Sequence, residues 1–463
     1  MKDFLPKNLI NLANLTKRPL YLVGGVVRNF LIDKSISNDV DLAGTISIEQ
    51  IKGCVEQIGL TISAVYPRTG TVMFKDGVYN YEYTAFRKEQ YVGGEHNPIF
   101  TEPTNDINED ALRRDFKCNA IYYDIKNAQF IDPLGGISNV EKRILDTVDK
   151  PNKVFSVDGL RLLRLARFVG QLNFTPTTEV IVGAKKFADN ILDISPERIY
   201  GELKLILNAD SKYPFSPING HYLALKVLDN TQVLDRIFPE LTLGRGMAQR
   251  SDFHKYDVLE HTLRAVLYSP AQVRLGALLH DVGKPFCFNH YGNYYNHSID
   301  GESIAEGILQ RLKVDKSTIK QVKFLVKEHM VDIDCSMRES KVRKFIQKNH
   351  QNLEQLLMIK QADFMACMDK NSVAPAVSKW TKIYDKMKAD GTPFSLKDLD
   401  ISSSDLIDIG YKREKISNEL NHLLEYAVVC PDKNKRQYLI AKAQSDFRFL
   451  NKKIAYISLN NKK

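Results

Sequence analysis

Two aspartates one residue apart, Asp39 and Asp41, are the side chains of this sequence best suited to chemistry. On an extended strand, residues i and i+2 project from the same face, so both carboxylates can face one point while Val40 and Leu42 pack behind them. Two such carboxylates can hold a pair of divalent cations against a nucleoside triphosphate. An isolated Asp-X-Asp pattern is more typical of a solvated hairpin strand than of a metal site. The neighbouring residues must therefore decide between these two interpretations.

The residues around this strand favour phosphate chemistry. Gly24 and Gly25 stand in LVGGVVRNFLIDKSISNDVDLAG, where a glycine pair permits close approach of the backbone to phosphates, and Arg28 offers a positive charge there. Further along, EDALRRDFKCNAIYYD carries Arg113 and Arg114, whose guanidinium groups can donate to triphosphate oxygens. Surface salt bridges explain these two arginines equally well.

Two kinds of element must position these residues. The first 150 residues alternate short β-rich runs, among them YLVGG, DVDLAG and KCNAIYYD, with helical stretches, which predicts one α/β sheet domain. From about Val157 the hydrophobic period changes to 3.6 and strand signals nearly vanish, which predicts helices to the C-terminus. At 463 residues, the chain should form roughly three domains.

Composition narrows the class of protein. Lys and Arg number 65 against 56 Asp and Glu, and the resulting charge of +9 suits a polyanionic partner. No signal peptide and no apolar run of membrane-spanning length is evident, so we expect no membrane association. The six cysteines lack CxxC pairing, which is typical of reduced thiols and indicates a cytoplasmic protein.

An ordered set of motifs carries a family resemblance. GGVVR, DVD and RRDFKCNAIYYD are followed by DPLGGI at 132–137, VDGLRLLRLARF at 157–168 and SPERIYGEL at 195–203. Together they resemble the class II tRNA nucleotidyltransferases, which comprise the CCA-adding enzymes and the bacterial poly(A) polymerases. The resemblance covers roughly residues 20–205 and continues more weakly to the end.

The resemblance implies an α+β fold. An N-terminal polymerase β-like nucleotidyltransferase head with a mixed sheet would be followed by an all-helical neck, an HD-containing body and a tail. The expected boundaries are 1–150 for the head, 151–220 for the base-selecting neck, 221–370 for the body and 371–463 for a tRNA-binding tail.

The resemblance also implies roles for particular residues. Asp39 and Asp41 would be the catalytic carboxylates that bind Mg²⁺, with Glu82 as a candidate third acidic group, although an exposed strand position explains Glu82 equally well. Asp158 and Arg161, three apart on a predicted helix, would read the incoming base in place of a nucleic-acid template. The full set expected to contact the nucleotide is Gly24, Gly25, Arg28, Arg113, Arg114, Asp115, Asn119, Asp158, Arg161 and Arg164.

Several positions depart from the family pattern. Asn29 stands where Asp is usual, Val157 replaces a Glu, and Gly159 replaces a Pro in the base-reading segment. The loop RKEQYVGGEHNP at 87–98 also differs, and this loop is linked to the switch from C to A addition. The nucleotides added therefore stay open between full CCA addition, a CC-adding or A-adding specialist, and a poly(A) polymerase.

Downstream, an ordered set of histidines and aspartates resembles the HD phosphohydrolase domain. A buried His-Asp step in an apolar helix needs compensation, and metal ligation supplies it. We expect Gly283-Lys284-Pro285 to end that helix. Imidazole and carboxylate ligands suit Ni, Mn, Co, Fe or Zn, and the centre could activate water against a phosphate ester such as a 2',3'-cyclic phosphate. A degenerate, nonhydrolytic domain is the alternative. The expected ligands are His261, His280, Asp281, His297, His329 and Asp363.

The tail predicts RNA contacts. Basic residues at its helix ends suit tRNA phosphates and would contribute affinity rather than sequence readout. The alternative is that these side chains are merely solvated. The residues are Lys412, Arg413, Lys435 and Arg436. The resemblance thus implies an enzyme that extends tRNA with CCA from CTP and ATP. The alternative of another class is a noncatalytic RNA-binding or signalling HD protein. Oligomeric state is left open.

Overall fold

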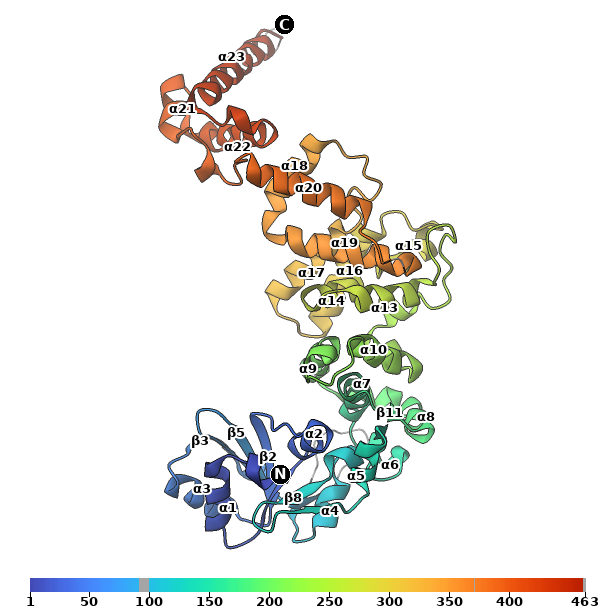
Figure 1. Cartoon of the computed structure of the whole chain (residues 1–463). Coiled ribbons are helices and arrows are strands. Elements are labelled where there is room, and N and C mark those ends of the chain that lie inside the picture. Colours follow the sequence, from blue (N-terminus) through green and yellow to red (C-terminus); the bar gives the residue numbers. More distant parts are fainter. Residues whose placement is uncertain (91–99, 370, 461–463) are drawn as a thin grey trace. The chain divides into compact units, whose positions relative to one another are not determined.

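The computed structural model describes residues 1–90, 100–369 and 371–460. The chain divides into two compact units, one formed by 1–247 with 306–319 and the other by 248–305 with 320–463 (Figure 1). The four predicted domain boundaries are not tested by this division and stay predictions. Among the described helices, none combines the length and apolar composition needed to cross a membrane.

The first unit contains a mixed sheet of seven strands in the order β3-β4-β5-β2-β1-β8-β9. Strands β2 and β5 run parallel, whereas the other neighbours run antiparallel. The strands are β1 (Leu20–Val23), β2 (Asp39–Gly44), β3 (Thr61–Tyr66), β4 (Thr71–Lys75), β5 (Asn80–Ala85), β8 (Tyr122–Asp124) and β9 (Gln129–Ile131). The expected mixed sheet is confirmed.

Alternation along the strands fixes which face carries the acidic residues. In β2, Val40 and Leu42 are buried while Asp39 and Asp41 are exposed, as the period of two requires. Beside this strand, β1 leads through Gly24 into helix α2 (Gly25–Asp33). The sheet therefore presents the two carboxylates on the side opposite its packed core.

Helices follow the sheet. The first unit continues with α4 (Ile107–Leu112), α6 (Pro151–Val157), α7 (Leu160–Leu172), α9 (Pro196–Leu207) and α10 (Gly220–Asn230). Helices α7 and α10 pack closely because Gly170 and Gly220 each leave room for the other's backbone oxygen. A short parallel pair, β10 (Ile144–Leu145) with β11 (Thr175–Pro176), interrupts the otherwise helical region.

The second unit is helical and holds the HD residues. The helices near those residues are α13 (Val258–Tyr268), α14 (Arg274–Leu279), α15 (Gly283–Tyr291), α16 (His297–Arg311), α17 (Lys316–Glu328) and α19 (Leu353–Met368). The end of α16 and the start of α17 belong to the first unit. The expectation that Gly283 ends a helix is wrong, because Gly283 begins α15 and His280-Asp281 lies in the turn after α14. A Cβ at Gly283 would lie 2.1 Å from the backbone oxygen of His297, so close packing against α16 requires glycine there.

Candidate active site and metal centre

Three acidic residues share one face of two neighbouring strands. The parallel register of β2 and β5 places Asp41 opposite Glu82 and Asp39 opposite Asn80. The Asn80 side chain donates to Asp39 Oδ1 at 3.1 Å. Glu82 is exposed and alternates with buried Tyr81 and Tyr83, so its carboxylate lies on the side of Asp39 and Asp41. The structure thus brings the candidate third carboxylate to the pair.

The Asp41 carboxyl group lies in a distinctive electrostatic environment. The surrounding protein removes water from this carboxyl although part of the residue remains exposed, and that burial, followed by the negative charge of Glu82, raises the pKa of Asp41 to about 6. The charges of Arg114, Arg164 and Arg28 act in the opposite direction. A divalent cation fits this group of carboxylates, because it would remove the repulsion between Asp41 and Glu82.

Gly24 allows the loop after β1 to approach the acidic face. Its φ is +75°, and a Cβ built there would lie 2.8 Å from Asp41 Oδ2. The adjacent Gly25 starts α2 without such a conflict. Residue 24 therefore needs glycine on two grounds, backbone conformation and contact with the Asp41 carboxylate.

Arg28 is buried under this site. It donates to Asn29 Oδ1 at 3.1 and 2.9 Å, to Asn119 Oδ1 at 2.5 Å and to the Tyr213 hydroxyl at 3.2 Å. The side chain is 1% exposed. Sequence reasoning placed Arg28 against the triphosphate, and the structure shows it joining residues from three parts of the first unit.

A buried chain of polar contacts continues from Arg28 to α7. Asn119 accepts from Arg28 and donates to Asp115 Oδ1 at 3.0 Å. Asp115 also accepts from Arg164 through Nε at 2.7 Å and Nη2 at 2.5 Å. Burial alone would raise the pKa of Asp115, but Arg164 and the hydrogen bonds hold it well below the ordinary range. The head and α7 are thereby locked together near the acidic strand.

Arg113 and Arg114 share one buried carboxylate. Arg113 Nε lies 2.7 Å from Asp110 Oδ1, and Arg114 Nη2 lies 2.9 Å from Asp110 Oδ2. The Tyr122 hydroxyl donates to Asp110 Oδ2 at 2.6 Å. Burial opposes ionisation of Asp110, but Arg114 and Arg113 lower its pKa to about 2. Both arginines are ion-paired inside the protein, and Arg114 is also close enough to influence Asp41.

The expected helical arrangement of Asp158 and Arg161 is wrong. Asp158 follows the end of α6 in an extended conformation, and its Oδ1 accepts from the backbone N–H of Leu160 at 2.9 Å. Arg161 instead donates to the backbone oxygens of Arg113 and Val154. The two residues therefore do not share one face of a continuous helix.

Close packing explains this break. A Cβ at Gly159 would lie 2.1 Å from the backbone oxygen of Asn190, whose side chain donates to the Phe155 backbone oxygen. The glycine found in place of the family's proline thus permits contact between this turn and the following segment. The base-reading role of Asp158 and Arg161 stays a prediction, and much of the 87–98 loop lies outside the described residues.

The predicted HD ligands converge in the second unit, and all six are buried. Asp363 Oδ1 lies 3.0 Å from His261 Nε2 and 3.5 Å from His280 Nε2. Asp281 Oδ2 lies 3.4 and 3.2 Å from the same two nitrogens. These four residues, from α13, the turn after α14 and α19, form one half of the centre.

The other half is formed by His297 and His329. Asp281 Oδ1 lies 3.3 Å from His297 Nε2 and 3.7 Å from His329 Nε2, and these two nitrogens are 3.3 Å apart. Asp281 therefore joins both halves. His280, Asp281 and His329 also offer one ligand atom each within 4.8 Å of one another.

The imidazole orientations fit a metal centre. The Nδ1 atoms of His280, His297 and His329 lie 2.7, 2.8 and 2.7 Å from backbone oxygens. This leaves each Nε2 directed at the carboxylates, as in metal sites where the second ring nitrogen is anchored by a carbonyl. His280 Nε2 and Asp281 Oδ2 are buried 3.2 Å apart, and a metal ion ligated by both would satisfy them.

The charges of the protein shift the pKa values of two of these histidines in opposite directions. Burial opposes a charged His280, but Asp281 and its hydrogen bonds raise the pKa of His280 to about 10. Burial, then the charges of His280 and His297, lower the pKa of His329 to about 3. Two buried lysines that the ligand motif does not reveal complete the surroundings, since Lys284 Nζ lies 2.6 Å from Asp281 Oδ2 and Lys360 Nζ donates to the His329 backbone oxygen.

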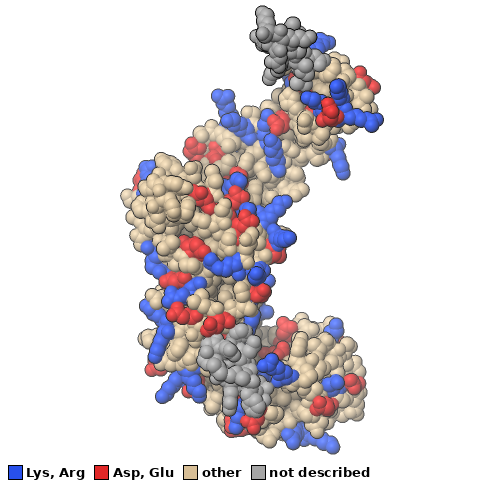
Figure 2. Space-filling view, turned by 180° about the vertical axis from the view of Figure 1, so that it is seen from behind, with Lys and Arg blue, Asp and Glu red and all other residues tan. Residues whose placement is uncertain are grey.

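The predicted RNA-binding residues lie at two helix N-termini of the tail. Lys412 and Arg413 are exposed at the start of α22 (Arg413–Val429), and Lys435 and Arg436 are exposed at the start of α23 (Arg436–Asn460). Helix N-termini favour phosphate groups. Figure 2 shows basic side chains dispersed among acidic ones on this face of the molecule.

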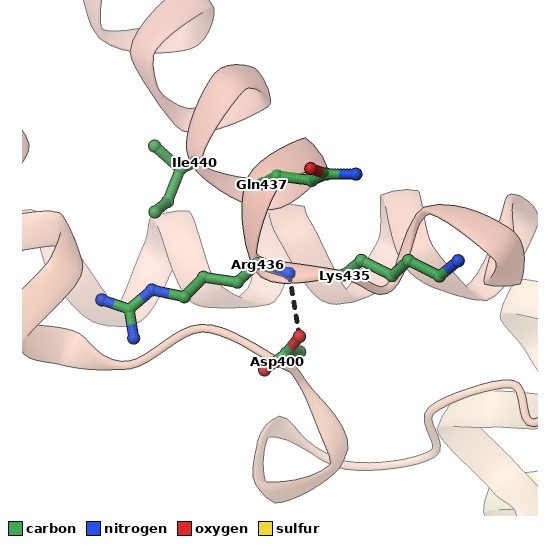
Figure 3. A pocket seen from close by; sticks show the side chains of 5 residues that line it. All are labelled: Asp400, Lys435, Arg436, Gln437 and Ile440. Carbon is green, nitrogen blue, oxygen red and sulfur yellow. Dashed lines mark hydrogen bonds between the residues drawn. The ribbon is translucent and has the colours of Figure 1, made fainter.

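A shallow hollow of about 550 Å³ lies at the start of α23. Its lining includes Lys435, Arg436 and Asp400, and Asp400 accepts from the Arg436 backbone N–H at 2.9 Å (Figure 3). The Arg436 guanidinium is paired with Asp405. Lys435 extends away from Arg436 in this view. Acidic neighbours thus offset part of the positive charge here.

Comparisons with known proteins agree with this arrangement. The poly A polymerase head domain family matches residues 20–146, and the HD domain family matches residues 254–364. The chain therefore contains a poly A polymerase head domain and an HD domain. The resemblance predicted from the sequence is confirmed at this level.

Curated relatives are tRNA nucleotidyltransferases. An A-adding tRNA nucleotidyltransferase of Deinococcus radiodurans is 31% identical over 296 residues, which cover 60% of this chain and 65% of that protein. A CCA-adding enzyme of Anoxybacillus flavithermus is 34% identical over 194 residues, covering 40% and 46%. A multifunctional CCA protein of Nitrosococcus oceani is 29% identical over 311 residues, covering 64% and 71%. The first two matches thus span less than two thirds of each relative.

Solved structures share the fold. The CCA-adding enzyme of Bacillus stearothermophilus in complex with CTP matches 97% of this chain and 100% of its own, with a TM-score of 0.67 and 20% identity. A tRNA nucleotidyltransferase complexed with a primer tRNA and an incoming ATP analog matches 82% of this chain and 99% of its own, with a TM-score of 0.54 and 20% identity. The α+β fold class is confirmed.

Proposed function

We propose that this protein is a template-independent nucleotidyltransferase that adds CCA to the 3' end of tRNA from CTP and ATP. The observation that carries the proposal is the strand register that puts Asp39, Asp41 and Glu82 on one face. Arg28, Arg114 and Arg164 lie close enough to influence the charge of that site. The names of the CCA-adding and multifunctional CCA relatives, and the CTP and tRNA complexes of proteins with this fold, support the same choice.

The side chains divide the work of the proposed reaction. Asp39 and Asp41 hold Mg²⁺, which when bound activates the primer hydroxyl and neutralises the leaving pyrophosphate. Gly24 lets the backbone approach the triphosphate, while the buried Arg28, Asn119 and Asp115 network keeps α7 against the head. Asp158 and Arg161 remain the proposed base-reading residues. The proposed location is the cytoplasm, which the pattern of unpaired cysteines favours.

The test offers tRNAs that end at the discriminator base, at the first C or at the second C, each with CTP or ATP. Wild-type protein should add two C residues and then one A, and Asp41→Asn should lose at least 99% of each rate. Glu56→Gln, an exposed carboxylate-to-amide change on α3 (Ile48–Gln57), is the matched control. Unaltered extension by Asp41→Asn would refute the proposed site.

An A-adding specialist is the second candidate. The 31% identical relative carries that activity in its name, and the loop linked to the C-to-A switch departs from the family pattern. Such an enzyme would extend only the tRNA that already ends in CC. Incorporation of CTP into tRNA ending at the discriminator base would exclude this candidate, whereas long poly(A) products would indicate a poly(A) polymerase.

We also propose phosphohydrolase activity at the HD centre. Its convergent Nε2 and carboxylate atoms suit Ni, Mn, Co, Fe or Zn, and a 2',3'-cyclic phosphate at an RNA end is the proposed substrate. Hydrolysis of that end group should require the added metal and should disappear in His280→Ala with Asp281→Ala. Absence of hydrolysis with every one of the five metals would indicate the noncatalytic alternative.

Basic residues of the tail complete the proposal by contacting tRNA phosphates. Lys412 and Arg413 at the start of α22, and Lys435 immediately before α23, are exposed where backbone N–H groups add to the attraction. Charge neutralisation at Lys412 and Arg413 should raise the KM for tRNA and flatten its salt dependence without changing kcat. An unchanged salt dependence would exclude this contact.

A further inference from the structure

A second group of metal-ligating side chains adjoins the HD centre. His254, His261 and Cys367 each offer a ligand atom, and these atoms lie within 4.8 Å of one another. Of the three, His261 alone belongs to the predicted HD ligand set. His254 precedes α13, and Cys367 lies one helical turn beyond Asp363 on α19. The group therefore extends the centre with a sulfur ligand that the HD pattern lacks.

The His261 ring differs from the other HD imidazoles. His280, His297 and His329 each place Nδ1 against a backbone oxygen, whereas His261 Nδ1 is buried with no hydrogen-bond partner. Its Nε2 lies 3.0 Å from Asp363 Oδ1, and the residue is 0% exposed. A buried nitrogen without a partner is costly, so it calls for a ligand.

His254 shows the same deficiency. Its Nδ1 is buried and has no hydrogen-bond partner, and its ring lies edge-on to that of His261 with centroids 4.9 Å apart. This ring contact does not satisfy either nitrogen, because no hydrogen bond joins the two imidazoles. A cation between them and the nearby sulfur would satisfy both rings.

The backbone holds this group in place. The N–H of Lys255, next to His254, donates to the Cys367 backbone oxygen at 2.9 Å. Two residues beyond Cys367, Asp369 accepts from the Tyr256 hydroxyl and, at 2.7 Å, from Arg264 Nη1 on α13. The segment between His254 and α13 is thus tied to the C-terminal end of α19.

We propose that His254, His261 and Cys367 bind a thiophilic divalent cation such as Zn²⁺ or Co²⁺ at a site beside the HD centre. Two imidazoles and one thiolate leave a fourth tetrahedral position for water. Ligand atoms around tetrahedral Zn²⁺ are separated by about 3.3–3.8 Å, so small side-chain rotations from the present spacing complete the geometry. The cation would fix the loop before α13. With the HD metal also bound at Nε2, His261 would bridge the two cations as an imidazolate, and its ring proton and the Cys367 thiol proton would be released to water.

Cobalt absorption tests the proposal in the full-length protein. After removal of metals by a chelator, titration with Co²⁺ should produce a near-ultraviolet thiolate-to-cobalt charge-transfer band. Cys367→Ser should abolish this band, and His254→Ala should weaken Co²⁺ binding at the band-forming site at least tenfold. Cys335→Ser, which changes a thiol of similar burial elsewhere in the second unit, should leave the band intact.

A second variant separates this site from the HD centre. His280→Ala with Asp281→Ala should lower the number of Co²⁺ ions bound while retaining the charge-transfer band. The contrary result is wild-type protein that shows bound Co²⁺ in its visible spectrum but no charge-transfer band. That result would overturn the proposed site and leave the proposal for the HD centre standing. An undiminished band in Cys367→Ser would overturn it as well, and this near-isosteric change avoids reliance on a variant that unfolds.

Discussion

Neutralising Glu82 changes the charge of the acidic face formed by Asp39, Asp41 and Glu82 with little change in side-chain shape. Glu82 lies opposite Asp41 across the parallel register, and after burial its charge is the main cause of the raised Asp41 pKa of about 6. Glu82→Gln removes this charge, so the Asp41 carboxylate should ionise more readily. Its pKa should therefore fall toward the ordinary aspartate value.

The size of the effect follows from the fraction of Asp41 that is ionised. With a pKa of about 6, about nine tenths is ionised at pH 7 and about one tenth at pH 5. Since the ionised form binds cations, the apparent Mg²⁺ affinity of wild-type protein should fall about tenfold between these pH values. A pKa one unit lower in Glu82→Gln would reduce that fall to about twofold.

The assay measures kcat and the apparent KM for Mg²⁺ between pH 5 and pH 7, with saturating ATP and a tRNA that ends in CC. Glu56→Gln on α3 should reproduce the wild-type profile. If Glu82 also binds metal, Glu82→Gln should lower kcat at every pH in addition to shifting the pH profile of the apparent KM for Mg²⁺. Coincident wild-type and Glu82→Gln profiles would refute the placement of Glu82 against Asp41.

Three further changes test other parts of the structure. Gly24→Ala places a Cβ against Asp41 at a residue with positive φ. We expect kcat to fall at least tenfold and the free energy of unfolding in urea to fall by about 1–2 kcal/mol. An unchanged kcat would contradict the close approach of residue 24 to Asp41. Arg28→Met removes buried hydrogen bonds and should cost about 2–4 kcal/mol, whereas a loss below about 1 kcal/mol would contradict its bracing role. His280→Ala with Asp281→Ala should lose bound transition metal by mass spectrometry yet extend tRNA within about twofold of wild type.

Local patterns predicted the acidic strand but not its partners. The two-residue period of a strand is enough to put Asp39 and Asp41 on one face. The place of Glu82 depends on which strand pairs with β2 and in what register, and β3 and β4 intervene in the sequence. No local signal sets a pairing between segments about forty residues apart, so Glu82 stayed a candidate until the fold was known.

Helix ends set by tertiary contacts were the other source of error. The 3.6 period predicted α7, but not the break at Asp158, because Gly159 meets the backbone of Asn190. Close packing also explains why His280 and Asp281 lie in a turn and not in the predicted helix, because Gly283 packs against the start of α16. The order of the HD ligands was readable in the sequence, whereas the unsatisfied Nδ1 of His261 became visible only with its surroundings.

Metal binding by the head tests the central claim most directly. In the His280→Ala with Asp281→Ala background, Mn²⁺ bound in the presence of a nonhydrolysable CTP analogue can be counted by electron paramagnetic resonance. The acidic strand predicts about two ions per head, both weakened at least a hundredfold by Asp39→Asn with Asp41→Asn. Unchanged Mn²⁺ binding in that variant would show that these carboxylates do not hold the catalytic metals.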